Sequence, residues 1–260
     1  MDNVFNLPAS DEFEYLSYKI PKVNNNILVL SDIHIPYHNI PALTCAIKYG
    51  KEHDVNTILL NGDIIDCYML SKFQKDPRKR SIKSELDYTR EFLDILDKEF
   101  SNAKKIYRYG NHEKRWESFM KNKAPEFFDC EEFTLEFHLK LDERKIDYVK
   151  DERIVYAGKL PILHGHEFGN RSGGTVNPAR TALLKAKKCV MVSHSHITSE
   201  DCKNSIDGDM ITAWSTGALC ELHPEYSRIN DWNHGFAHII TDKSGNFYVT
   251  NKRIIDGKLM

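Results

Sequence analysis

Residues 26–34, NILVLSDIH, place a short apolar run directly before an aspartate and a histidine. The same order returns in VNTILLNGD (55–63) and KKIYRYGNH (104–112), and the stretches between them, ALTCAIKYGKEH (42–53) and ELDYTREFLDILDKEF (85–100), resemble helices. In the longer stretch, leucines and aromatic residues recur every three or four residues, as on the buried face of a helix. Strands that alternate with helices predict an α/β fold with a central sheet.

The second half of the chain predicts more strands, one helix and a final hairpin. The strands are RIVYAG (153–158), KLPILHG (159–165), CVMVSHSH (189–196), DMITAWSTGA (209–218) and GFAHIITD (235–242), the helix is NPARTALLKAK (177–187), and the hairpin is DKSGNFYVT (242–250). Residues 1–25 read as an arm or a first edge strand, and residues 26–260 as one domain. The charged and aromatic stretch 113–150 reads as a helical insertion that caps this domain.

Composition narrows the class of protein. The 260 residues are 41% hydrophobic and 28% charged, which is ordinary for a globular chain and unlike a disordered or collagen-like one. The net charge of −2 offers no overall positive field for nucleic acid. No apolar run is long enough to span a bilayer and the first residues are acidic and polar, so we expect a soluble, cytoplasmic protein. The six cysteines form no CxxC pair, which favours free thiols.

Side chains that can bind metals follow five of the predicted strands, in SDIH, NGDIID, GNHE, LHGH and SHSH. The carboxyl ends of strands in α/β sheets meet at one rim, so these side chains are expected in one pocket. Alternate side chains of an extended segment point the same way, so the two members of each D-x-H or H-x-H pair are expected to reach one small volume. Oxygen and nitrogen donors without a thiolate suit Mn²⁺, Fe²⁺ or Zn²⁺, and so many donors suit two ions about 3.5 to 4 Å apart.

This series resembles the ordered signature of the calcineurin-like metallophosphoesterase superfamily, D-x-H, G-D-x-x-D, G-N-H-[DE], H and G-H-x-H, over residues 31–196. Trp232, Gly235 and Phe236 also resemble an element of small stand-alone phage or bacterial members, more as packing than as chemistry. Ser193 departs from the usual glycine of the last motif but removes no ligand. The resemblance implies a four-layer α/β/β/α sandwich of two mixed sheets with a dinuclear centre. It implies that one ion is held by Asp32, His34 and His196, the other by Asn111, His164 and His194, with Asp63 bridging the two.

The resemblance also implies the reaction, which is hydrolysis of a phosphate ester by a hydroxide that bridges the two metal ions. His112, next to the expected ligand Asn111, would protonate the leaving group as general acid, and Asp66 would orient and charge its imidazole. Arg115 and His166 are candidate substrate contacts, because a guanidinium can fork onto a phosphate. Each has an ordinary alternative, Arg115 as a surface arginine and His166 as a solvated loop residue. In LHGH either histidine could be the ligand, and the family pattern favours the first.

Other functions stay open. DNA repair exonucleases share these metal motifs, so a metal-dependent nuclease is the first alternative, although KDPRKRSIK (75–83) is the single basic run. An inactive binding scaffold is a remote alternative, since no ligand is lost. The expected partner is a phosphoester substrate, with nucleic acid less favoured and no membrane, and the oligomeric state stays open.

Weaker signals accompany these. Arg171, Arg180 and the loop 170–174 are minor candidates for phosphate contact, and the loop lacks the lysine pattern of a P-loop. The aromatic residues of the insertion are expected to form its own small core; they are Trp116, Phe119, Phe127, Phe128, Phe133 and Phe137. Such a cap favours small or exposed phosphoesters over internal positions of duplex DNA.

Overall fold

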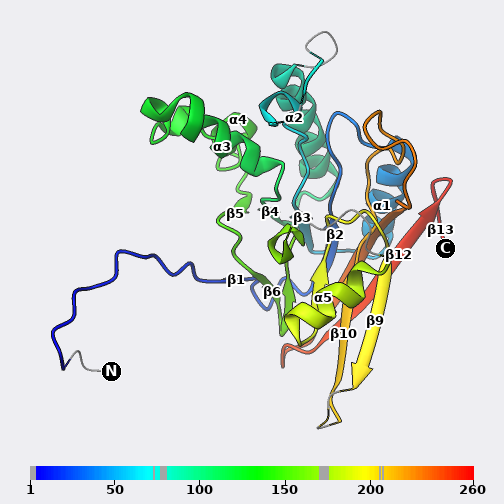
Figure 1. Ribbon diagram of the computed structural model, residues 1–260. Helices are drawn as coiled ribbons and strands as arrows, with labels where there is room; N and C mark the ends of the chain where they lie inside the picture. The colour runs from blue at the N-terminus through cyan, green and yellow to red at the C-terminus, as the bar shows by residue number, and fades with distance from the viewer. Residues whose placement is uncertain (1–3, 73, 77–80, 170–175, 205, 207) are drawn as a thin grey trace.

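The computed structural model describes residues 4–72, 74–76, 81–169, 176–204, 206 and 208–260, whose strands form two sheets (Figure 1). The seven-stranded sheet has the order β13 (Lys258–Leu259), β12 (Phe247–Ile255), β11 (His234–Thr241), β2 (Asn26–Leu30), β3 (Thr57–Asn61), β4 (Lys104–Arg108) and β5 (Asp147–Val149). The six-stranded sheet has the order β1 (Tyr18–Lys19), β6 (Val155–Ala157), β7 (Leu160–Ile162), β8 (Val190–Val192), β10 (Met210–Ser215) and β9 (Ser199–Asn204).

Both sheets are mixed, as the family resemblance implies. In the larger one β2, β3, β4 and β5 are parallel, whereas β11 pairs antiparallel with β2 and with β12. In the smaller one β8 is parallel to both β7 and β10, while β9 runs antiparallel to β10. The parallel strands bring the loops that follow β2, β3 and β4 to one edge of the larger sheet.

The alternation of side chains along β2 separates two hydrophobic cores. Leu28 and Leu30 point into the core shared with α1 (Ile40–Glu52) and α2 (Ile82–Glu99), and Ile27 and Val29 point into the core between the two sheets. All four side chains are fully buried. Because successive side chains of a strand face opposite sides, a continuous apolar run marks a strand that is covered on both faces.

The outer face of the smaller sheet is covered by α5 (Pro178–Ala186), whose Ala182 and Leu183 pack with Val190 and Val192 of β8. The order of layers is therefore helices, seven-stranded sheet, six-stranded sheet and helix. This confirms the expected α/β/β/α sandwich.

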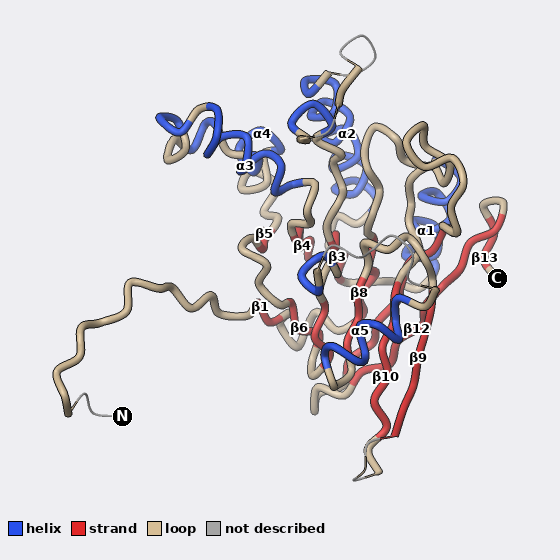
Figure 2. The backbone as a smooth tube through the Cα atoms, viewed as in Figure 1, coloured by secondary structure: helices blue, strands red, loops and turns tan. Residues whose placement is uncertain are grey.

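The stretch 113–150 differs in part from the expected helical insertion. It contains α3 (Glu113–Lys123) and α4 (Leu135–Leu139), which lie together apart from the sheets (Figure 2), but it ends in β5, which extends the larger sheet. The expected aromatic core is also wrong for most of its members, because five phenylalanines are 37 to 48% exposed: Phe119, Phe127, Phe128, Phe133 and Phe137. Trp116 alone of the set packs against the main core, with its indole N–H donating to the Phe133 carbonyl at 2.7 Å.

Residues 4–15 are exposed and extend away from the body, and β1 then joins the edge of the smaller sheet beside β6 (Figure 1). The edge strand β1 agrees with one of the two expectations for residues 1–25, whereas the sequence patterns do not predict the strands β5, β9 and β13. Among the described residues, no helix has both the length and the apolar character that a membrane span needs. All six cysteines are free, as predicted.

Candidate metal centre

The five predicted strand ends meet at one place. The loops after β2, β3, β4, β7 and β8 bring together Asp32, His34, Asp63, Asp66, Asn111, His112, His164, His194 and His196. Asp63 lies at the centre, with its Oδ2 3.2 Å from His164 Nε2 and 3.9 Å from His34 Nε2. Asp32 Oδ1 lies 3.3 Å from His196 Nε2 and 3.9 Å from His164 Nε2. The rings of His34 and His196 approach each other with their Nε2 atoms 3.2 Å apart.

The local backbone is not the extended one that the D-x-H and H-x-H spacing suggested. Five of the site residues have positive φ, at 51°, 51°, 53°, 67° and 58° for Asp32, His34, Asp63, His194 and His196. Residues other than glycine rarely adopt this conformation, and such strain is concentrated at functional sites. The side chains converge because each loop turns sharply at its polar residue, so the expectation of convergence holds for a different reason.

Two glycines of the motifs allow this close approach. A Cβ on Gly62 would lie 2.6 Å from His164 Nδ1, and one on Gly110 would lie 2.3 Å from Asp63 Oδ1. The glycine of G-D and that of G-N are therefore required by packing around the central aspartate.

Hydrogen bonds fix which nitrogen of two rings faces the pocket. His164 Nδ1 lies 2.8 Å from the Asn61 carbonyl, so that its Nε2 faces Asp63. His34 Nδ1 lies 2.9 Å from Asp66 Oδ1, so that its Nε2 faces inward. A ring N–H held by a carbonyl or carboxylate leaves the other nitrogen with a lone pair, which is the form that binds a metal.

Three atoms of the predicted ligands have no hydrogen-bond partner among the described residues, although they are buried: Asp32 Oδ1, Asn111 Oδ1 and His164 Nε2. A buried polar atom without a partner costs free energy on the order of 1–3 kcal/mol. A carboxylate oxygen, an amide oxygen and an imidazole nitrogen are donors that suit divalent cations, which would satisfy them. Groups of histidine and aspartate side chains here could hold metal ions, for instance Asp63, His164 and His194.

Comparison with known proteins agrees with this geometry. The model of the calcineurin-like phosphoesterase family matches residues 26–215, which is well over half of the chain. The chain belongs to the calcineurin-like phosphoesterase family. Membership supports a hydrolase, and the phosphoester is the class of substrate on which such an enzyme acts.

Individual relatives of this phosphoesterase are distant. The Gene 54 protein of Mycobacterium phage L5 is 23% identical over 180 residues, which are 67% of this chain and 70% of that protein. Among solved structures, Vacuolar Protein Sorting 29 from Cryptosporidium parvum is 14% identical, with a TM-score of 0.48 over 91% of this chain and 94% of that one. A dimetal phosphatase from Danio rerio is 11% identical, with a TM-score of 0.40 over 88% and 96%. The family assignment rests on the family model.

Three buried carboxylates, those of Asp32, Asp63 and Asp66, favour positive charge in this pocket. Burial opposes protonation of His164 and His196, but neighbouring side chains outweigh it: Asp63 raises the pKa of His164 to about 9, and Cys220 and Asp32 raise that of His196 to about 10. Conversely, burial and the neighbouring His164 lower the pKa of His194 to about 4. A field that holds protons on buried imidazoles also attracts a cation.

His112 and Asp66 lie together as expected. His112 Nδ1 lies 2.8 Å from the Asp66 carbonyl and 3.0 Å from Asp66 Oδ1, while the same carboxylate also contacts His34. Burial opposes protonation of His112, but Asp63 and Asp66 outweigh it and raise its pKa. His112 Nε2 faces Arg115 Nη2 at 2.8 Å, and Arg115 Nη1 donates to the Asp66 carbonyl at 2.9 Å.

The weaker candidates have different outcomes in the structure. The His166 side chain is only 10% exposed and its ring lies 5.4 Å from that of His164, so the alternative of a solvated loop residue is wrong. Arg180 is exposed on α5. Trp232 packs its ring 4.1 Å from that of His196, as the packing interpretation predicts. Arg171, the loop 170–174 and part of the basic run 75–83 lie outside the described residues.

Glu113, the fourth residue of GNHE, was given no role from the sequence. Its fully buried carboxylate accepts from the backbone N–H groups of Asp63, Ile64 and Gly110 at 3.0, 2.8 and 2.8 Å, and from the Tyr107 hydroxyl at 3.0 Å. It therefore ties the loop of Asp63 to that of Asn111. Its place three residues after Gly110, at the start of a helix, was the available signal.

A buried ion pair was also missed. The Arg108 guanidinium, 1% exposed, pairs with Glu167, whose other oxygen accepts from the Gly165 N–H at 2.6 Å. Despite burial, Arg108 holds the pKa of Glu167 at about 2. The pair fixes the loop that carries His164 and His166, and from sequence Arg108 reads only as the last residue of a strand.

Proposed function

We propose that this phosphoesterase holds two divalent cations and uses them to hydrolyse a small or exposed phosphate ester. The observation that carries the proposal is that Asp32 Oδ1, Asn111 Oδ1 and His164 Nε2 are buried without a hydrogen-bond partner among the described residues, and that His164 Nε2 lies beside both Asp32 and Asp63. A structural polar core would satisfy these atoms internally. A loaded dinuclear centre satisfies them with cations.

The ligands divide into two groups that share Asp63. One ion is assigned to Asp32, His34 and His196, the other to Asn111, His164 and His194, and Asp63 to both. The central position of Asp63 supports this division, since its Oδ2 faces one ring from each group. Oxygen and imidazole donors suit Mn²⁺, Fe²⁺ or Zn²⁺.

When bound, the two cations supply a water of lowered pKa as the nucleophile and offset the charge of the phosphoryl group. The protein's own part is to hold the substrate and to protonate the leaving group. We assign that proton to Nε2 of His112, because Asp66 holds the opposite nitrogen and the nearby carboxylates favour the imidazolium.

Arg115 must move for this acid to act. A guanidinium is a donor only, so while Arg115 Nη2 lies 2.8 Å from His112 Nε2 that nitrogen must accept, and it cannot carry the proton. A bound phosphate offers Arg115 a better acceptor. We therefore assign Arg115 to the substrate phosphate. When its guanidinium moves to the phosphate, His112 Nε2 no longer accepts from it and can carry the proton. His166, at the edge of the pocket, is assigned to substrate contact.

The test is His112→Ala, assayed on an alkyl phosphate ester and on a nitrophenyl ester with matched metal loading. Loss of a general acid should lower kcat on the alkyl ester by roughly 10²- to 10⁴-fold and spare the nitrophenyl ester, whose leaving group needs no proton. His53→Ala, at the end of α1, is the control. Equal losses on both esters, or loss of metal in proportion to activity, would contradict the assignment.

A nuclease acting on single strands is the second candidate, and the exposed phenylalanines of the cap favour it. Bases stack on exposed aromatic rings, and Lys121 Nζ lies 4.9 Å from the Phe128 ring centroid. Replacing Phe127 and Phe128 by serine distinguishes hydrolysis of a small phosphate ester from cleavage of a single strand. Unchanged kcat/KM on a small diester together with loss of single-strand cleavage would support the nuclease, and absence of any such cleavage by the unaltered protein would remove it.

A further inference from the structure

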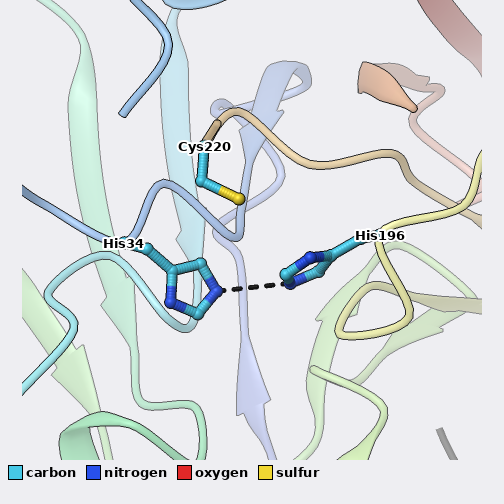
Figure 3. A group of neighbouring side chains, drawn as sticks. All are labelled: His34, His196 and Cys220. Carbon is cyan, nitrogen blue, oxygen red and sulfur yellow. Dashed lines mark hydrogen bonds between the residues drawn. The ribbon is translucent and has the colours of Figure 1, made fainter. Parts of the chain in front are cut away.

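Cys220 brings a thiol into the metal centre. It lies in the loop after β10, is 3% exposed, and comes together with His34 and His196 from two other segments of the chain (Figure 3). Its Sγ and one nitrogen of each ring all lie within 4.8 Å of one another. The residues matched by the family model end at 215, before this cysteine.

Backbone contacts hold this thiol in place beside the loop of Asp32 and His34. The residue before it, Leu219, donates its N–H to the Asp32 carbonyl at 3.0 Å, and the Cys220 carbonyl lies 2.9 Å from His234 Nε2. On the other side, Glu221 donates its N–H to the Tyr37 carbonyl at 2.8 Å. The position of the sulfur is therefore set by the same loop that presents two of the assigned ligands.

The surroundings of Cys220 differ from those of an ordinary buried cysteine. A buried thiol usually packs as a small hydrophobic side chain. The thiol of Cys67 packs in this way, within the core beneath α1 and α2. Leu219, the neighbour of Cys220 in sequence, belongs to the same core. Within the part of the chain that the structure describes, Cys220 belongs to none of the hydrophobic cores.

A further donor points to the same position. Asp32 Oδ1 is fully buried, has no hydrogen-bond partner among the described residues, and lies 3.3 Å from His196 Nε2. Around one ion with metal–nitrogen bonds near 2.05 Å and a metal–sulfur bond near 2.3 Å, neighbouring donors are separated by roughly 2.9 to 3.6 Å in four- to six-coordinate sites. The observed separations of 3.2 and 3.3 Å match this, and the sulfur lies within 4.8 Å of one nitrogen of each ring.

We propose that Cys220 is a ligand of the ion held by Asp32, His34 and His196, and that its sulfur makes this position select Zn²⁺ or Fe²⁺ over Mn²⁺. The inference rests on the proposed function, since it concerns one of the two ions assigned there. A thiol gives up its proton when it binds such an ion. A thiolate adds a negative charge to those of Asp32 and the shared Asp63, and so offsets more of the positive charge of two buried cations.

The expectation of a donor set without a thiolate is thereby revised. From the sequence, Cys220 lies 24 residues after the last histidine of the series and outside every motif. Thiolates favour zinc and iron, while carboxylate and water favour manganese. The two positions of the centre are therefore expected to differ in the metal they prefer.

The test loads metal-free protein with Co²⁺ under reducing conditions and records the near-ultraviolet spectrum alongside the cobalt content. A thiolate bound to Co²⁺ gives a ligand-to-metal charge-transfer band, which we expect in the wild type and in the control Cys45→Ser, and which Cys220→Ser and Cys220→Ala should lose. In dialysis against equal Zn²⁺ and Mn²⁺, the zinc-to-manganese ratio at one site should fall at least about tenfold in the Cys220 variants.

The outcomes separate the two proposals. Two cobalt ions per chain with no charge-transfer band in the wild type would overturn the assignment of Cys220 and leave the dinuclear centre standing. No bound cobalt at all would overturn the centre itself. Because the decisive spectrum is that of the unaltered protein, misfolding of a variant cannot obscure the result.

Discussion

Glu113 offers the sharpest test of how the loops of the centre are held. In Glu113→Gln one carboxylate oxygen becomes an NH₂ group, which cannot accept a hydrogen bond. If the amide turns its NH₂ toward Tyr107, the hydroxyl can rotate to accept; the Ile64 N–H then loses its partner, as does the Ile65 N–H, whose bond is already long at 3.5 Å. If it turns the other way, the N–H groups of Asp63 and Gly110 both lose theirs.

The less costly orientation sets the expected magnitude. One orphaned backbone N–H costs about 1–3 kcal/mol, and the remaining bonds weaken because their acceptor is no longer charged, which adds about 1 kcal/mol. We expect Glu113→Gln to lower the free energy of unfolding by roughly 2–4 kcal/mol.

The assay is urea denaturation of metal-free protein, with Glu117→Gln on the same helix as the control. Metal content after loading should also fall in Glu113→Gln, because the loop of Asp63 loses its tie. A variant within about 0.5 kcal/mol of wild type would refute this account, since that is the range of substitutions that break no buried contact.

Three further expectations concern other buried groups. Burial and Asp66 raise the pKa of Glu85 to about 7, so the folded state favours the protonated carboxyl and loses stability as pH rises from about 4.5 to 7. The free energy of unfolding of Glu85→Gln should therefore be higher than that of wild type by roughly 1–3 kcal/mol at pH 8 and by little at pH 4.5. An equal gain by the exposed Glu91→Gln would contradict this. Glu167→Gln leaves the guanidinium of Arg108 buried without its anion, so urea denaturation should show a loss of roughly 2–4 kcal/mol, and no loss would show that the pair is not needed. Arg115→Ala should lower kcat/KM about 10- to 100-fold with both metals retained. An unchanged kcat/KM in that variant would contradict the assignment of Arg115 to the substrate site.

The layers of the fold could be predicted because their strands are continuous apolar runs. The run ILVL in β2 is covered on both faces, and such a run has few other places in a folded chain. Short edge strands carry no such signal. The residues of β9, SEDCKN, are polar and mostly exposed, and they become a strand only because β10 offers an unpaired edge.

The donor atoms of the centre could be predicted for a different reason: residue types that bind metals directly follow the apolar strands in the sequence. What holds them could not be predicted. Glu113 and Arg108 act through contacts between loops distant in sequence, and a charged residue at the end of a strand or the start of a helix ordinarily indicates a solvated position. Cys220 is close to the histidines only because its loop packs on that of Asp32.

The most direct test of the central claim is the metal content of the purified protein after loading and dialysis, measured by elemental analysis. Asp63→Asn removes the shared charge while keeping the shape and the left-handed backbone that asparagine tolerates, and Asp256→Asn, also at positive φ but exposed in a distant turn, is the matched control. The account predicts two divalent ions per chain in the wild type and in Asp256→Asn, and a loss at both positions in Asp63→Asn. Clearly fewer than two ions in the wild type, or two retained in Asp63→Asn, would contradict it.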